Sequence, residues 1–97
     1  MAFGPRRLAG PPPVYPSRLR QQGVTGRVIV SFVVDTAGRV EPASVSVISA
    51  TERDFVDPTL EAVRGSRFSP GLLAGCPVRV RIVQPVNYCL GACLEPQ

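Results

Sequence analysis

The stretch "GRVIVSFVVDTAGRV", residues 26–40, decides the fold. Its apolar side chains alternate along the chain, which predicts a β-strand with one strongly apolar face. The residues on that face are Val28, Val30, Phe32 and Val34. Ile29 and Val33 fall on the opposite face. Because both faces carry apolar side chains, we expect this strand to lie in the centre of its sheet.

The residues that follow predict a hairpin. Residues 35–38 read "DTAG", and Gly38 is placed to take a positive φ in a bulged hairpin turn. The hairpin predicts a return strand from about Ser44 to Ser49. This strand is more polar on one side than its partner, which is typical of an outer strand.

Two helices are expected to flank the hairpin. A short helix from Pro16 to Gln22 begins with proline at its first position and has Leu19 as its apolar anchor. In the second helix Asp57 is the predicted N-cap and Pro58 occupies the first turn. The "SPG" of residues 69–71 is expected to end this helix.

A third strand is predicted from Val78 to Gln84, where apolar and basic residues alternate. We expect Pro85, which lacks an N–H, to end its pairing. The order helix, strand, strand, helix, strand predicts an α+β domain, with a three-stranded antiparallel sheet and two helices on one face. The third strand then lies at a sheet edge and exposes unpaired N–H and C=O groups.

The composition bounds the class of protein. A chain of 97 residues with 44% apolar residues is long enough for one small domain. Its net charge of +4 permits contact with nucleic acid, anionic lipid or an acidic partner. Aromatic residues make up only 6%, too few for the stacking platforms of single-strand binders. A small basic nucleic-acid-binding domain stays an alternative that steep salt dependence would favour.

Residues for catalysis or metal binding are few. The chain has no histidine, which excludes a Ser-His-Asp triad. Cys76, Cys89 and Cys93 do not have the spacing of a zinc site. We therefore expect no enzyme activity, no cofactor and no bound metal. The cysteines are interpreted as buried or free thiols, with a local Cys89–Cys93 disulfide as the alternative in an oxidising compartment.

Two runs of sequence resemble the C-terminal domain of TonB-type energy transducers. The first, "PPPVYPSRLRQQGVTGRVIVSFVVDTAGRV", has Tyr-Pro before a short helix, Gly-x-x-Gly, a β-run and an Asp-x-x-Gly turn. The second, "VDPTLEAVRGSRFSPGLLAGCPVRVRIVQPVNY", has an Asp-led helix, Arg-Phe-x-Pro, Gly-x-Pro-Val and a final strand. The resemblance covers about Pro13 to Tyr88 in unbroken order.

The resemblance implies a role in transport. Such proteins are anchored in the bacterial inner membrane, where a proton-driven complex energises them. Their periplasmic C-terminal domain binds the TonB-box peptide of an outer-membrane receptor, which allows import of siderophores or vitamin B12. The box adds as a strand beside the third predicted strand. The implied peptide-binding residues are Val78, Arg79, Val80, Arg81, Ile82, Val83 and Gln84.

Tyr15 and Pro16 carry the Tyr-Pro motif, which in the family lies near receptor contacts. The alternative is structural: Tyr15 packs on the sheet and Pro16 starts the helix. For the arginines of the third strand, the alternative to peptide binding is a solvated face that protects the edge.

We expect three segments: a Pro-rich linker remnant over residues 1–14, the TonB-like domain over 15–88, and a flexible cysteine-containing tail over 89–97. No stretch approaches the roughly 18 apolar residues of a membrane span, so we expect the implied anchor to lie outside this sequence. Two alternatives keep the fold. The domain is an interaction module of another envelope protein, or it forms a homodimer because Ile29 and Val33 are poorly covered.

Overall fold

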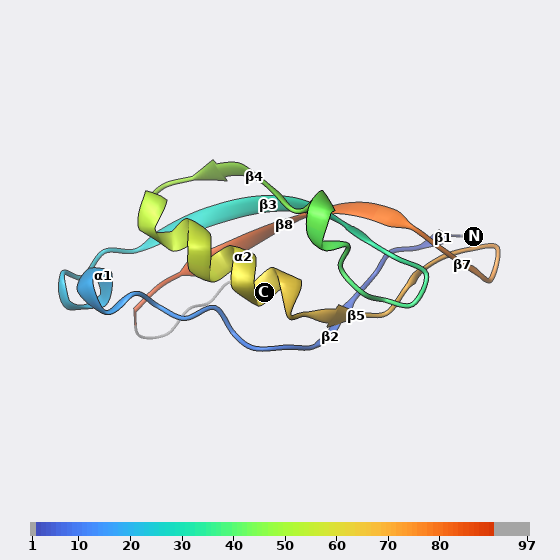
Figure 1. Ribbon diagram of the computed structural model, residues 1–97, viewed down its shortest axis with the longest axis horizontal. Helices are drawn as coiled ribbons and strands as arrows, with labels where there is room; N and C mark the ends of the chain where they lie inside the picture. The colour runs from blue at the N-terminus through green and yellow to red at the C-terminus, as the bar shows by residue number, and fades with distance from the viewer. Residues whose placement is uncertain (1, 91–97) are drawn as a thin grey trace.

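The computed structural model describes residues 2–90, and its centre is a three-stranded antiparallel sheet (Figure 1). The order of its strands is β4-β3-β8. They are β3 (Gly26–Val34), β4 (Ser46–Ala50) and β8 (Val80–Tyr88). The predicted α+β class is confirmed, with the first predicted strand in the centre of the sheet.

The helices are α1 (Ser17–Gln21) and α2 (Val56–Arg64), with two 3₁₀ helices, η1 (Pro42–Ser44) and η2 (Arg53–Phe55). In Figure 1, α2 lies across the sheet and α1 lies near one end of it. Leu19, the predicted anchor of α1, is only 2% exposed. Within residues 2–90, no helix is long and apolar enough to cross a membrane.

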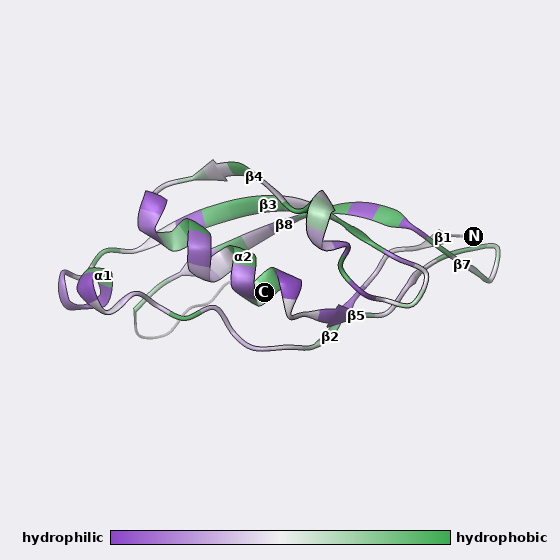
Figure 2. Ribbon diagram, in the orientation of Figure 1, coloured by the Kyte–Doolittle hydropathy of each residue, from purple (hydrophilic) through white to green (hydrophobic). Residues whose placement is uncertain are grey.

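The core lies between the inner face of the sheet and α2. All four residues that the alternation of β3 placed on one face are fully buried, which confirms that prediction. Phe55, Val63 and Phe68 pack in the same cluster. Figure 2 shows the contrast: β3 is hydrophobic along most of its length, whereas α2 alternates between hydrophobic and hydrophilic residues. Helix α2 therefore depends on the sheet to bury its apolar side.

The predicted turn after β3 is present. Asp35 Oδ1 accepts hydrogen bonds from the backbone N–H groups of Ala37 and Arg39. Gly38 has a φ of 83°, as predicted. A Cβ at this position would lie 2.0 Å from the carbonyl oxygen of Phe68, so only glycine fits. The N–H of Phe68 donates to the Gly38 carbonyl at 2.8 Å, which fastens the turn to the chain after α2.

Two small sheets lie outside the sequence prediction. One has the order β1-β6-β7 and the other pairs β2 with β5. Their strands are β1 (Ala2–Phe3), β2 (Arg7–Ala9), β5 (Arg67–Phe68), β6 (Gly71–Leu73) and β7 (Cys76–Val78). They hold the N-terminal segment beside the chain that follows α2. The assignment of residues 1–14 to a linker stays a prediction.

Several predicted boundaries are wrong. The return strand begins at Ser46 and not at Ser44, because Ser44 belongs to η1. Ser44 Oγ accepts a hydrogen bond from the backbone N–H of Val33 at 2.8 Å. The return strand is nevertheless an outer strand, as expected. Asp57 is not the N-cap of α2, since η2 leads directly into the helix and the buried Phe55 takes that position. The carboxylate of Asp57 instead lies in the first turn, where its negative charge interacts favourably with the positive end of the helix dipole.

The end of α2 also differs from the prediction. The helix stops at Arg64, with Gly65 as its C-cap, well before residues 69–71. Phe68 then lies in β5 and is buried against Phe32, with ring centroids 5.5 Å apart. The chain leaves the helix early because the buried Phe68 and the pairing with β2 need an extended backbone.

Candidate functional site

Strand β8 is a long edge strand. Its register with β3 is unbroken from Val80 opposite Val34 to Tyr88 opposite Gly26. On its other side, no strand within residues 2–90 pairs with it. Unpaired N–H and C=O groups on such an edge are available to another extended chain.

The hydrogen bonds that β3 makes on its β4 side show which backbone N–H and C=O groups of β8 face the open edge. Val33 donates its N–H to Ser44 Oγ, and its carbonyl accepts the N–H of Glu41 at 2.9 Å. Arg27 accepts the N–H of Thr51 at 3.0 Å. The odd-numbered residues of β3 thus direct their backbone groups toward the β4 side, and the even-numbered ones toward β8. Because the direction alternates in an antiparallel pair, the odd-numbered residues of β8 direct theirs to the open edge.

The prediction that Pro85 ends the pairing is wrong. Pro85 lies opposite Ile29, and the ladder continues to Tyr88. Proline is tolerated here because its missing N–H belongs to the open edge and not to the ladder. The Pro85 carbonyl accepts a hydrogen bond from Nε2 of Gln84 at 3.2 Å. Before this proline, the open edge presents the N–H and C=O groups of Arg81 and Val83.

The structure separates the predicted site residues into two groups. The five residues from Val80 to Gln84 lie together on β8. Val78 lies in β7 and pairs with Gly71 in a different sheet, and Arg79 lies between the two strands. The sequence alternation spans both strands because β7 and β8 are nearly continuous along the chain. That Val78 to Gln84 bind a peptide stays a prediction.

The two arginines of this stretch have partners within the domain. Arg79 donates through Nε and Nη2 to the two carboxylate oxygens of Glu41, at 2.6 and 2.7 Å. This hydrogen-bonded pair lowers the pKa of Glu41. Arg81 Nη1 donates to Ser31 Oγ at 2.7 Å across the outer face of the sheet. Both exposed side chains therefore make hydrogen bonds within the domain, while the outward backbone groups of β8 have no strand beside them in residues 2–90.

Tyr15 and Pro16 have clear structural roles. The Tyr15 ring packs edge-on against Phe55 and Tyr88, with centroid distances of 5.5 and 5.6 Å. Its hydroxyl donates to the carbonyl of Val24. Pro16 is the N-cap of α1. These contacts favour the structural interpretation, and a receptor contact at the same residues stays a prediction.

An aromatic cluster, which sequence reasoning missed, anchors the end of β8. The rings of Tyr88 and Phe55 stack with centroids 4.2 Å apart. The Tyr88 hydroxyl is hydrogen-bonded to Thr59 Oγ1 at 2.7 Å, and burial raises the pKa of Tyr88. The signal was present in the sequence, since the alternation of β8 resumes after Pro85 at Val86 and Tyr88.

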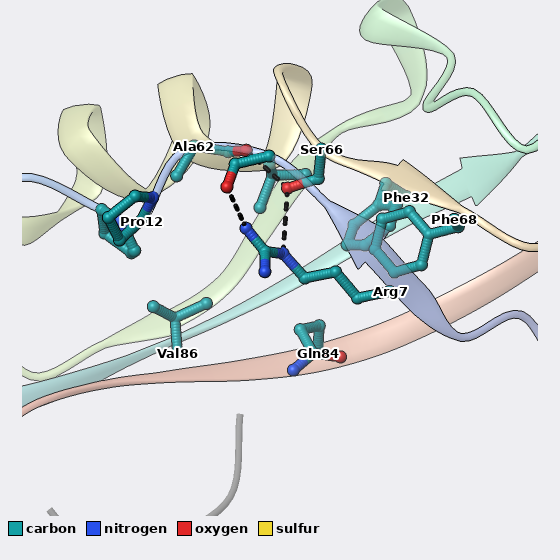
Figure 3. Close-up of a pocket in the computed structure, with 11 residues that line it drawn as sticks. Arg7, Pro12, Phe32, Ala62, Ser66, Phe68, Gln84 and Val86 are labelled. Carbon is teal, nitrogen blue, oxygen red and sulfur yellow. Dashed lines mark hydrogen bonds between the residues drawn. The ribbon is translucent and has the colours of Figure 1, made fainter.

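A pocket of about 240 Å³, also missed, lies beside the inner face of β8 (Figure 3). In that view β8 runs below the pocket and α2 above it, while the side chain of Arg7 reaches between them. Gln84 and Val86 contribute the β8 wall. No sequence motif marks this space, because its walls come from four separate parts of the chain: the N-terminal segment, β3, α2 with the residues that follow it, and β8.

The cysteines do not form a metal site in the part of the chain that the structure describes. Residues 2–90 contain no group of three His, Cys, Asp or Glu side chains that is able to hold a metal ion. Cys76 is an exposed free thiol. Cys89 is disulfide-bonded, and Cys93, its expected partner, lies outside the described residues.

The fold defines a small α+β domain with a long, regular edge strand, an architecture suited to binding rather than to catalysis. Residues 11–90 match the family described as Gram-negative bacterial TonB protein C-terminal, and the chain belongs to that family. Domains of this family are interaction modules and not enzymes.

Individual relatives agree with the family match. The chain is 33% identical over 88 residues to Protein TonB of Escherichia coli K12, which covers 90% of this chain and 36% of that protein. It is 33% identical over 78 residues to Protein TonB of Vibrio cholerae, covering 80% and 32%. The chain thus spans about a third of the length of these relatives.

A solved structure has the same fold. The solution NMR structure of Pseudomonas aeruginosa TonB CTD superposes with a TM-score of 0.73 at 26% sequence identity. The match covers 92% of this chain and 89% of that one.

Proposed function

We propose that this chain is the periplasmic, receptor-binding domain of a TonB-type energy transducer. It binds the TonB-box peptide of an outer-membrane receptor by strand addition to β8. The observation that carries the proposal is the open edge at Arg81 and Val83, whose backbone groups point away from β3. Backbone bonding depends little on peptide sequence, so one domain can serve several receptors.

The strength of such an edge follows from its hydrogen bonds. The N–H and C=O groups of Arg81 and Val83 give four bonds to an added strand. At about 0.5–1.5 kcal/mol net for each bond, they contribute about 2–6 kcal/mol before the peptide loses its conformational freedom. We therefore expect the isolated peptide to bind weakly, with additional affinity from side-chain contacts.

Family membership supports a proposal for the role of the whole protein. The full-length protein would be anchored in the inner membrane and energised there by a proton-driven complex. Pulling on the bound box would then support uptake of a siderophore or cobalamin through the receptor. Because the linked backbone bonds of an added strand lie side by side, they share such a load.

The test is a backbone amide NMR titration of the domain with a synthetic TonB-box peptide. Controls are a scrambled peptide and a single-stranded DNA oligomer. The proposal predicts shifts concentrated on residues 81–84, with β4 unchanged and the scrambled peptide weaker. Shifts confined to another surface would refute strand addition at β8. Salt-sensitive binding of the oligomer alone would favour the nucleic-acid alternative.

A further inference from the structure

We infer that the pocket beside β8 receives one aliphatic side chain from the strand that adds to this edge. The inference rests on the proposed function and adds to it a side-chain preference at one peptide position. The pocket has the position, the size and the fixed outer wall that such a side chain requires, and its lining carries the positive charge of Arg7.

The pocket lies on the β8 side of the sheet. Its walls include Gln84 and Val86 of β8 and, from β3, only Phe32, whereas β4 contributes nothing. An added strand would lie about 4.8 Å from β8, with its side chains alternating between the two faces of the sheet. The side chains on the inner face would therefore stand next to Gln84 and Val86, where the pocket lies.

The size and chemistry of the pocket fit a single side chain. Its volume of about 240 Å³ is below the roughly 300–1,000 Å³ of small-molecule sites. Val63, Phe68 and Val86, all buried, form much of its interior. Covering such a surface with a branched aliphatic group removes apolar area from water on both partners.

The outer wall is built by the N-terminal segment and is held in place. Arg7 Nη2 donates to the carbonyls of Gly10 and Pro11, at 2.9 and 3.3 Å. Its Nε donates to Ser66 Oγ at 3.4 Å, just beyond the C-terminus of α2. A Cβ on Gly10 would lie 2.7 Å from Ser66 Cα, so the segment packs tightly there. The pocket is therefore formed before any peptide binds, which lowers the entropic cost of filling it.

The positive charge of Arg7, which lines the pocket, selects against basic side chains. Arg7 is an exposed residue, and its guanidinium donates hydrogen bonds to carbonyl and hydroxyl oxygens. No carboxylate within residues 2–90 forms a salt bridge with it. A lysine or arginine at the inward peptide position would meet this like charge, whereas leucine, isoleucine or valine would not.

The test is a double-mutant cycle on the TonB-box peptide and the pocket. Leucine and alanine are placed in turn at each peptide position, and dissociation constants are measured by NMR titration. The pocket is filled by Ala62→Val and Ala62→Leu, since Ala62 lines it from α2. Glu61→Leu adds an aliphatic side chain at an exposed neighbouring position and serves as the control. Thermal unfolding of each variant checks that the domain is folded.

One inward peptide position should lose about tenfold in affinity on leucine-to-alanine replacement in the wild-type domain. The loss should shrink with Ala62→Val, vanish with Ala62→Leu and persist with Glu61→Leu. The same loss in wild type and Ala62→Leu, with edge amides still shifting, overturns the pocket inference alone. If no peptide of the series shifts the β8 amides, strand addition fails and the pocket inference falls with it.

Discussion

The two edges of the central sheet differ in length, regularity and exposure. Strand β4 has five residues, all exposed, and its register with β3 shifts between Ile29 and Val30. Strand β8 has nine residues and keeps an unbroken register with β3. Shortness and irregularity are devices by which proteins protect edges from unwanted pairing. The fold protects one edge of its sheet and leaves the other regular.

This difference suggests that the β8 edge is retained for a partner. A long, regular edge is an aggregation liability unless it is used. Arg79, just before β8, bonds to Glu41, and Arg81 on the outer face of β8 bonds to Ser31, so both side chains have partners within the domain. Only Pro85 interrupts the row of edge donors, and it lies beyond Arg81 and Val83.

The largest expected effect is on the free energy of unfolding, from a substitution in the central strand β3, which pairs with both edge strands. Phe32 is fully buried at the centre of β3. Phe32→Ala should lower the free energy of unfolding by about 3–5 kcal/mol, because it leaves a cavity in the core. Chemical denaturation measures this value. Val47→Ala on the exposed β4 is the control and should change it by less than about 0.5 kcal/mol. Equal losses would contradict the location of the core.

The next largest effect is expected on peptide affinity, from a substitution that alters only the β8 edge. Val83→Pro removes one outward N–H of β8 without removing a bond to β3, so the domain should stay folded, as it does with Pro85. Peptide affinity should fall about tenfold, equivalent to about 1.4 kcal/mol. Val83→Ala keeps the N–H and is the matched control in the NMR titration. An equal fall for both variants would show that the side chain, and not the backbone, binds the peptide.

A smaller effect should appear at alkaline pH at the end of β8. Burial raises the pKa of Tyr88 above its ordinary value of about 10, so the folded state holds this proton more tightly than the unfolded state does. The stability that Tyr88 contributes is complete below about pH 10 and is lost as the pH rises through the raised pKa. Thermal unfolding from pH 8 to 11.5 measures the decline.

Tyr88→Phe is the control for this titration, because it keeps the ring and removes the ionisable group. Its stability should fall less steeply over the same pH range than that of the wild type. Parallel curves would show that Tyr88 does not couple the anchoring of β8 to pH.

The smallest effect is expected at the Glu41–Arg79 ion pair. The pair is solvent-exposed, and such pairs contribute little to stability. Glu41→Gln should leave the unfolding midpoint and the peptide dissociation constant close to those of wild type at neutral pH. A large loss of peptide binding, measured in the same titration, would instead assign this pair to the binding site.

The sequence predicted the centre of the molecule better than its margins. The alternation of β3 was sufficient because a buried strand face leaves a period-two pattern, and Gly38 was identified because its turn requires a positive φ. The N-cap of α2 was missed because the buried Phe55 fixes the helix start through tertiary packing. β1 and β2 were missed because they pair with residues about sixty or more positions away.

The candidate site was predictable in part. The residues of the edge strand were found from Val80 to Gln84, yet the continuation past Pro85 depends on which side of the strand lacks a neighbour. Sequence alone does not reveal that orientation. The pocket was not predictable either, since the N-terminal segment, β3, α2 with the residues after it, and β8 form it together.

The most direct test of peptide binding at the β8 edge is amide hydrogen exchange of the domain saturated with TonB-box peptide. Strand addition at β8 predicts new protection at the N–H groups of Arg81 and Val83, which face the open edge. The even-numbered neighbours Ile82 and Gln84, already bonded to β3, should change less, and β4 should be unaffected. Protection that appears on β4, or uniformly along β8 without this alternation, would contradict strand addition at the β8 edge.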